Sequence, residues 1–121
     1  MCKENEIIKK DIKSISEWLN TSLDNLQIDY QIESIENYKK QAIEMLGTFD
    51  EFPKNKKKMN KILKMLKNGE KPMPIYVEKD DPHNFIMEGR HRIVAFYLMG
   101  FKDVEVARCS LKIENKNKLN P

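Results

Sequence analysis

Residues 85–100 read FIMEGRHRIVAFYLMG, and this stretch decides the fold. Its first three residues favour a β-strand, because strands are enriched in aromatic and β-branched side chains and polar loop-forming residues come just before it. Apolar residues then recur at helical spacing from Ile93 to Gly100, with few polar positions between them. We therefore predict a strand, a turn at Gly89, and a helix that is buried on nearly all sides and ends at Gly100.

The turn between that strand and helix is rich in basic residues and reads Glu88-Gly89-Arg90-His91-Arg92. A helix N-terminus presents unpaired N–H groups and a partial positive charge, and glycine lets a ligand approach the backbone closely. Cations in a first helical turn oppose the helix dipole, so a bound anion would resolve the conflict. The pattern indicates a phosphate site; the alternative is that the arginines lie on the surface and pair with Glu88 or Asp103.

The whole chain has the size and composition of one globular domain. It has 121 residues, of which 40% are hydrophobic and 34% charged, and its net charge is +3. That excess of positive charge is too small to indicate nucleic-acid binding. No apolar run approaches the length of a membrane span and the first residues do not resemble a secretory signal, so we expect a cytoplasmic protein without a membrane partner. Cys2 and Cys109 have no neighbouring cysteine, so neither a disulfide framework nor a metal site is indicated.

The remaining elements follow from apolar spacing. Helices are predicted over residues 4–20, 35–46 (ending at Gly47) and 55–68, and strands over residues 75–77, 85–87 and 101–111. Residues 23–32 are ambiguous, a weak strand or a loop. The two strands at 75–77 and 85–87 should pair as a hairpin, and residues 85–106 should form a β-α-β unit with a right-handed parallel crossover. We therefore expect an α/β fold, with a small mixed sheet and packed helices.

Two charged segments have a structural and a functional interpretation. Asp50 and Glu51 could orient a metal or accept a proton, or they could complement the charge of the lysine-rich helix that follows. The lysines of residues 54–67 could grip a phosphate backbone, or they could form the solvated face of an amphipathic helix.

The order of these elements resembles the ParB/sulfiredoxin-like superfamily. The residues that carry the resemblance are 66–77 (LKNGEKPMPIYV), 86–95 (IMEGRHRIVA) and Gly100. The resemblance covers residues 48–111 as the core, preceded by residues 1–47 as a helical extension packed on it and followed by residues 112–121 as a polar tail. In that superfamily the glycine turn holds the phosphates of ATP or CTP. The resemblance implies that the phosphates lie at Gly89, Arg90, His91 and Arg92, and that the base and sugar lie near Gly69, Lys71 and Pro72.

At several positions the chain departs from the family's motifs, and these departures exclude some of the family's activities from what we expect. Sulfiredoxins have a reactive cysteine where this chain has Arg90, so we do not expect sulfinic-acid reduction. Only a short tail follows this unit, so we do not expect the DNA reader that partition proteins carry after it. The turn is similar to that of the superfamily's free serine kinases, which implies Mg²⁺ held by Glu88 and a nucleophile oriented by Glu51. A Mg-dependent nucleotide hydrolase or phosphotransferase is thus one expectation.

Two further alternatives stay open at this stage. One is a small non-catalytic protein that engages a nucleic acid or a protein partner through its basic surface. The other is a metal-dependent DNA nuclease, for which the sequence has no cluster of carboxylates suited to two metals.

Overall fold

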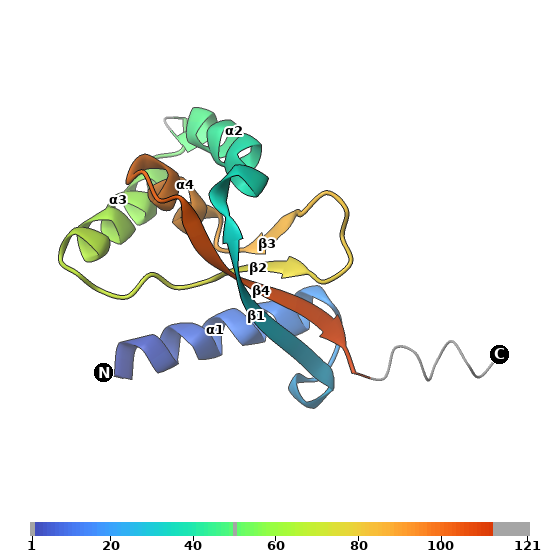
Figure 1. Cartoon of the computed structure of the whole chain (residues 1–121). Coiled ribbons are helices and arrows are strands. Elements are labelled where there is room, and N and C mark those ends of the chain that lie inside the picture. The colour runs from blue at the N-terminus through green and yellow to red at the C-terminus, as the bar shows by residue number, and fades with distance from the viewer. Residues whose placement is uncertain (1, 50, 113–121) are drawn as a thin grey trace.

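The computed structural model describes residues 2–49 and 51–112, and helices and strands are interspersed along the chain (Figure 1). The helices are α1 (Cys2–Trp18), α2 (Lys39–Phe49), α3 (Pro53–Lys67) and α4 (Arg90–Leu98), with short 3₁₀ turns at Leu23–Asn25 and Ile35–Tyr38. The strands are β1 (Leu26–Ser34), β2 (Ile75–Glu78), β3 (Ile86–Glu88) and β4 (Asp103–Leu111). The α/β class with a mixed sheet is confirmed. No helix of the described residues is long and apolar enough to cross a membrane.

The described strands form one sheet in the order β1-β4-β2-β3. β2 pairs with β3 in antiparallel fashion, as the predicted hairpin requires, and pairs with β4 in parallel. β3 therefore runs opposite to β4, so the predicted parallel β-α-β unit over residues 85–106 was wrong. The hairpin places β3 at an edge of the sheet, and α4 then carries the chain back across the sheet to the other side of β2. The parallel crossover links β2 to β4.

The amino-terminal part of the chain contributes to the sheet itself. The ambiguous segment becomes the nine-residue strand β1, which pairs with β4 from Leu26 opposite Leu111 to Ser34 opposite Asp103. Residues 1–47 thus supply an edge strand, which the predicted helical extension did not include. α2 also passes the predicted stop at Gly47 and ends at Phe49. Burial of Phe49 stabilises this last turn and offsets the modest cost of a helical glycine.

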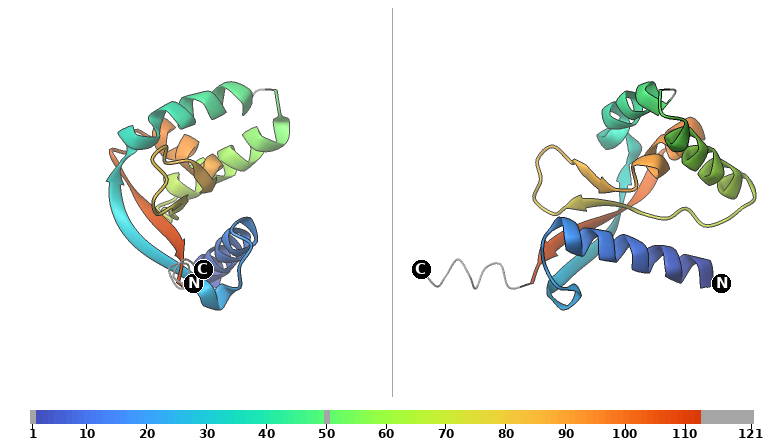
Figure 2. Two further views of the ribbon diagram at one scale, coloured as in Figure 1. Left: turned by 90° about the vertical axis from the view of Figure 1, so that its right-hand side faces the viewer. Right: turned by 180° about the vertical axis from the view of Figure 1, so that it is seen from behind.

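Helices cover both faces of the sheet (Figure 2). α2, α3 and α4 pack on one face, where the core includes Tyr38, Ile75, Val77, Ile93, Phe96 and Val106. α1 lies on the other face, over a smaller cluster that includes Ile15, Tyr76, Met87 and Ala107. The four residues Ile93–Phe96 are all buried, which confirms the prediction of an α4 enclosed by the core.

A partly buried ionic cluster joins β1 to β4 on the face covered by α2. The Arg108 guanidinium donates to both carboxylate oxygens of Glu33, at 2.9 and 2.8 Å, and to the Asn84 side chain at 2.9 Å. The Tyr38 hydroxyl donates to the same carboxylate at 2.6 Å. Burial works to raise the pKa of Glu33, but the hydrogen bonds from Arg108, Tyr38 and Gln31 outweigh it and hold that pKa at about 2.

Candidate functional site

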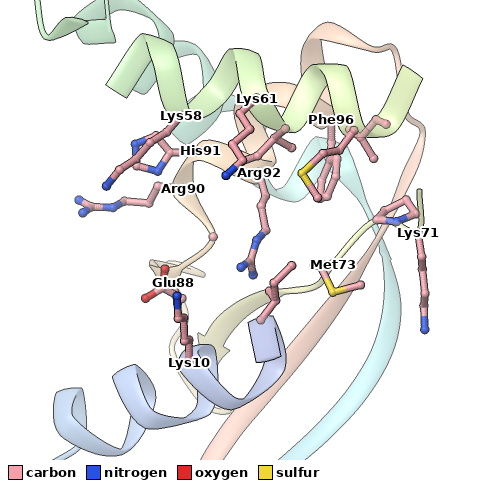
Figure 3. Close-up of a pocket in the computed structure, with 16 residues that line it drawn as sticks. Lys10, Lys58, Lys61, Lys71, Met73, Glu88, Arg90, His91, Arg92 and Phe96 are labelled. Carbon is pink, nitrogen blue, oxygen red and sulfur yellow. The ribbon is translucent and has the colours of Figure 1, made fainter. Parts of the chain in front are cut away.

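A cavity of about 550 Å³ opens at the N-terminal end of α4, within the usual size range of small-molecule sites. Its walls come from four places in the chain: α1, α3, the segment that joins α3 to β2, and the turn from β3 into α4 (Figure 3). The sequence turn that we singled out at residues 88–92 therefore lies in the wall of a cavity.

Gly89 shapes the turn at the cavity wall. Its φ is +100°, in the left-handed region that glycine adopts at little cost. A Cβ built at this position would lie 3.0 Å from the Ile75 Cγ2 atom and 3.1 Å from the Ile75 Cα atom. The turn thus needs a residue without a side chain, both for its φ and for its close packing on β2. Held in this way, the first-turn N–H groups of α4, which have no helical partners, lie at the start of the cavity.

Arg92 lines the cavity, but its guanidinium is already engaged. It forms a two-point ion pair with Asp11 of α1, at 2.8 and 2.9 Å, and donates to the Pro74 carbonyl oxygen at 2.9 Å. Asp11 is only 4% exposed. Arg92 therefore ties α1 and the start of β2 to α4, a role that the sequence spacing did not indicate.

His91 is held in place by two neighbours. Its Nε2 atom lies 3.0 Å from the Asn55 side-chain oxygen, and its ring stacks on Phe49 with centroids 5.3 Å apart. An oxygen acceptor at that distance places the proton on Nε2 in the neutral ring. Burial, and then the positive charges of Lys58, Arg90 and Arg92, lower the pKa of His91. The ring is therefore neutral at physiological pH in the free protein, and it can gain a proton when an anion arrives.

Exposed cations surround this turn. Beside Arg92, the lining includes Arg90 of α4 and four lysines from three other segments: Lys10, Lys58, Lys61 and Lys71. Among the described residues that line the cavity, Glu88 is the sole carboxylate. Six cationic side chains against one carboxylate make a strongly positive cavity, and Arg92 among them is neutralised by Asp11. Such a site attracts polyanions.

The cavity is not uniformly polar. Figure 3 shows Arg90, His91 and Lys58 gathered at one end, and Phe96 and Met73 at the other, with Lys71 as the labelled cation beside them. The cavity lining also includes further apolar side chains from α3 and the following segment, namely Ile62, Met65, Leu66 and Pro72. A cavity that is cationic at one end and apolar at the other suits a ligand with a charged and a flat or apolar part.

The structure gathers most, but not all, of the site residues predicted from sequence. Those that line the cavity are Lys71, Pro72, Glu88, Gly89, Arg90, His91 and Arg92. Gly69 is exposed at the end of α3, where its positive φ of +83° lets the chain leave the helix, and it does not line the cavity. From the sequence we did not place Lys10, Lys58 or Lys61 at this site, although we gave the lysines of residues 54–67 as possible contacts to a phosphate backbone. The signal for the last two was their i, i+3 spacing on the same face as Ile62 and Met65.

The two carboxylates that were predicted to be catalytic, Glu51 and Glu88, do not both line the cavity. Glu51 is exposed in the turn between α2 and α3 and is not part of the lining, and Asp50 lies outside the described residues. Within the described residues, no three His, Cys, Asp or Glu side chains are grouped as a metal site requires. Glu88 by itself does not make a dedicated Mg²⁺ site, although Mg²⁺ is commonly held by one or two carboxylates together with substrate phosphates.

Comparison of the chain with protein-family models, with curated proteins and with solved structures gave no match.

Proposed function

We propose that this protein is a nucleotide-binding domain of the ParB/sulfiredoxin-like kind, and that it binds a nucleoside triphosphate such as ATP or CTP in the cavity at the start of α4. One observation carries the proposal: a single cavity of suitable size is cationic at one end and apolar at the other. The phosphates would lie at the first turn of α4, against Arg90, Lys58 and Lys61. The base would lie against Met73 and Phe96.

The proposal is for binding rather than for phosphoryl transfer. The lysines and Arg90 are exposed and can move to meet phosphate oxygens, and charge-assisted hydrogen bonds of this kind are among the strongest that proteins form. Phosphoryl transfer also requires metal ions and a group that orients the nucleophile. Glu51, which was expected to supply the second of these, is not in the cavity wall. Any Mg²⁺ would arrive with the triphosphate, and Glu88 is the residue placed to contact it.

Isothermal titration calorimetry on a matched pair of double variants tests the proposal. Lys58→Ala/Lys61→Ala removes two lysines from the cavity wall. Lys57→Ala/Lys64→Ala removes two exposed lysines of the same helix that do not line it, so the net charge is identical. ATP and CTP, each with Mg²⁺, should bind the wild type and the control alike. The cavity variant should bind them about tenfold more weakly or worse.

Inorganic tripolyphosphate separates the two ends of the cavity. If the base is recognised, ATP or CTP should bind more tightly than tripolyphosphate does, because only a nucleotide reaches the apolar end. Equal affinities for the nucleotides and for tripolyphosphate would mean that the protein does not recognise the base. A wild-type protein that binds none of these compounds, or equal weakening in both double variants, would overturn the proposal as a whole.

A further inference from the structure

The two edge strands of the sheet differ in length and in what covers them. β3 has only three residues, and a side chain of α2 covers its edge: the Gln41 amide donates to the Asn84 carbonyl at 2.7 Å and accepts from the Ile86 N–H at 3.1 Å. Gln41 thus takes the place of a neighbouring strand. β1 is the opposite edge and is three times as long, and its pairing with β4 has no shift in register. Figure 2 shows β1 along one outer side of the molecule, with none of the described helices beyond it.

β1 lacks most of the features that usually protect an edge strand. Such strands are blunted by charged side chains, above all lysine, by proline, by a bulge or by a short length. The sequence of β1, LQIDYQIES, contains neither lysine nor proline, and its ladder is unbroken. It also exposes large apolar side chains, since Tyr30 is 48% and Ile32 is 68% exposed.

The bonds at the two ends of β1 show which backbone groups face outward. Lys112 N–H donates to the Asn25 carbonyl at 2.8 Å, and Ile35 N–H donates to the Lys102 carbonyl at 2.9 Å. Asn25 and Ile35 are odd-numbered and lie directly before and after β1, and bonded pairs alternate along an antiparallel ladder. The even-numbered residues therefore direct their N–H and C=O groups away from β4. These residues are Leu26, Ile28, Tyr30, Ile32 and Ser34.

We propose that this edge binds a second copy of the same chain, with the two β1 strands antiparallel and the two-fold axis at Tyr30. The sequence of β1 is self-complementary about that residue. Ile28 lies opposite Ile32 of the second copy, and Tyr30 lies opposite Tyr30. Each of these pairs exchanges two backbone hydrogen bonds, and their side chains form one apolar stripe.

The charges favour this register over the two registers whose axis is shifted by one residue. With the axis at Tyr30, Asp29 faces Gln31 and Glu33 faces Gln27, so every carboxylate of β1 meets an amide. Moving the axis by one residue places Asp29 opposite Asp29 in one direction and opposite Glu33 in the other. Like charges directly opposite each other destabilise a strand pair. A symmetric interface of this kind closes after two copies and leaves no free β1 edge.

Sedimentation velocity across a concentration series tests for the dimer, which should be in concentration-dependent equilibrium because the interface of one strand pair is small. Ile32→Lys introduces a charge into the apolar stripe at a side chain that is largely exposed, so the monomer should still fold. Ile43→Lys is the matched control, since Ile43 is an exposed isoleucine on α2. The wild type and the control should dimerise alike, and Ile32→Lys should stay monomeric with an unchanged circular dichroism spectrum.

Disulfide trapping tests the register. In a Cys2→Ser background, Tyr30→Cys places two cysteines opposite each other, about 5.5 Å apart between Cα atoms, a distance that a disulfide spans. Gln27→Cys is the control, because its two copies would be six residues out of register and about 20 Å apart. Mild oxidation should cross-link the first variant and not the second. A wild type that stays monomeric at every concentration, a dimer that survives Ile32→Lys, or equal cross-linking of both cysteine variants would overturn the proposal.

Discussion

Arg92 of α4 and Asp11 of α1 are joined by two hydrogen bonds, one to each carboxylate oxygen, at 2.8 and 2.9 Å. A third Arg92 N–H reaches the Pro74 carbonyl oxygen just before β2. The pair therefore fastens the amino-terminal helix to the cavity wall. It also leaves Arg92 little capacity to bind an anion, so in the proposed function that task falls to Arg90 and the lysines.

Loss of Asp11 should destabilise the fold. Asp11→Ala leaves the Arg92 guanidinium without its partner at a largely enclosed position, and removing one partner of a buried ion pair costs about 3 kcal/mol. Glu17→Ala, at an exposed carboxylate on the same helix, should change stability by less than about 0.5 kcal/mol. Urea unfolding measures both. In the double variant Asp11→Ala/Arg92→Ala the loss should be smaller than the sum of the two single losses. Equal losses of stability in Asp11→Ala and Glu17→Ala would contradict this role of Asp11.

The two glycines Gly89 and Gly47 should respond to alanine with opposite signs. Gly89→Ala forces a side chain into a positive φ and against Ile75, which should cost about 2 kcal/mol or more of stability. Gly47 lies in α2 with open space around its Cα, so Gly47→Ala should stabilise the protein by about 0.5–1 kcal/mol. Thermal unfolding compares the two variants. A neutral Gly89→Ala would mean that the turn tolerates a side chain after all.

Nucleotide binding should take up protons at His91. Burial and the surrounding cations lower the pKa of His91, and negative charge from bound phosphates would raise it again. Calorimetric titration of ATP in two buffers of different ionisation enthalpy measures the uptake. His91→Gln should reduce the uptake relative to the wild type, whereas His83→Gln, at an exposed histidine in the β2–β3 loop, should not. The ligand's own titration contributes equally to both variants. Equal uptake in the two would place His91 away from the phosphates.

The pH dependence of the free energy of unfolding should reveal the contribution of the Glu33 ion pair. Its folded pKa of about 2 lies below the value of 4.5 for a free glutamate. The stability that its ion pair supplies is therefore fully present above about pH 4.5 and is lost as the pH falls towards about 2. Glu33→Gln should lower the stability at neutral pH by about 2 kcal/mol, a figure reduced from the full linkage value because the pair is partly exposed to solvent.

Denaturant unfolding between neutral and acidic pH tests this prediction, with Glu36→Gln as the control at an exposed carboxylate of the neighbouring turn. The Glu33→Gln curve should be flatter than the wild-type curve in the acidic range, and the Glu36→Gln curve should follow the wild type. Parallel curves for all three proteins would show that Glu33 does not control acid stability.

The spacing of apolar residues predicted the helices and strands well where those residues recur regularly. The helix from Arg90, its burial on nearly all sides and the β2–β3 hairpin all followed from residues 75–100. β1 was ambiguous because Leu26, Ile28, Tyr30 and Ile32 alternate as in a strand, yet a helix was also possible there. In the structure only Leu26 of these four residues is buried. Its pairing with β4 joins segments that are distant in the chain, and strand spacing carries no information about which strand will be the neighbour.

The sequence by itself determined the basic glycine turn at Gly89, because the positive φ that glycine allows and the basic residues that follow it are local features of the chain. Only the tertiary structure decided what that turn faces. Folding brings Lys10 of α1 and the lysines of α3 to the same cavity, and pairs Arg92 with Asp11, 81 residues apart in the chain. It also leaves Glu51 outside the cavity wall. The physical reason is that side-chain spacing fixes the face on which a residue lies within its own helix or strand, whereas the packing of those elements fixes what that face meets.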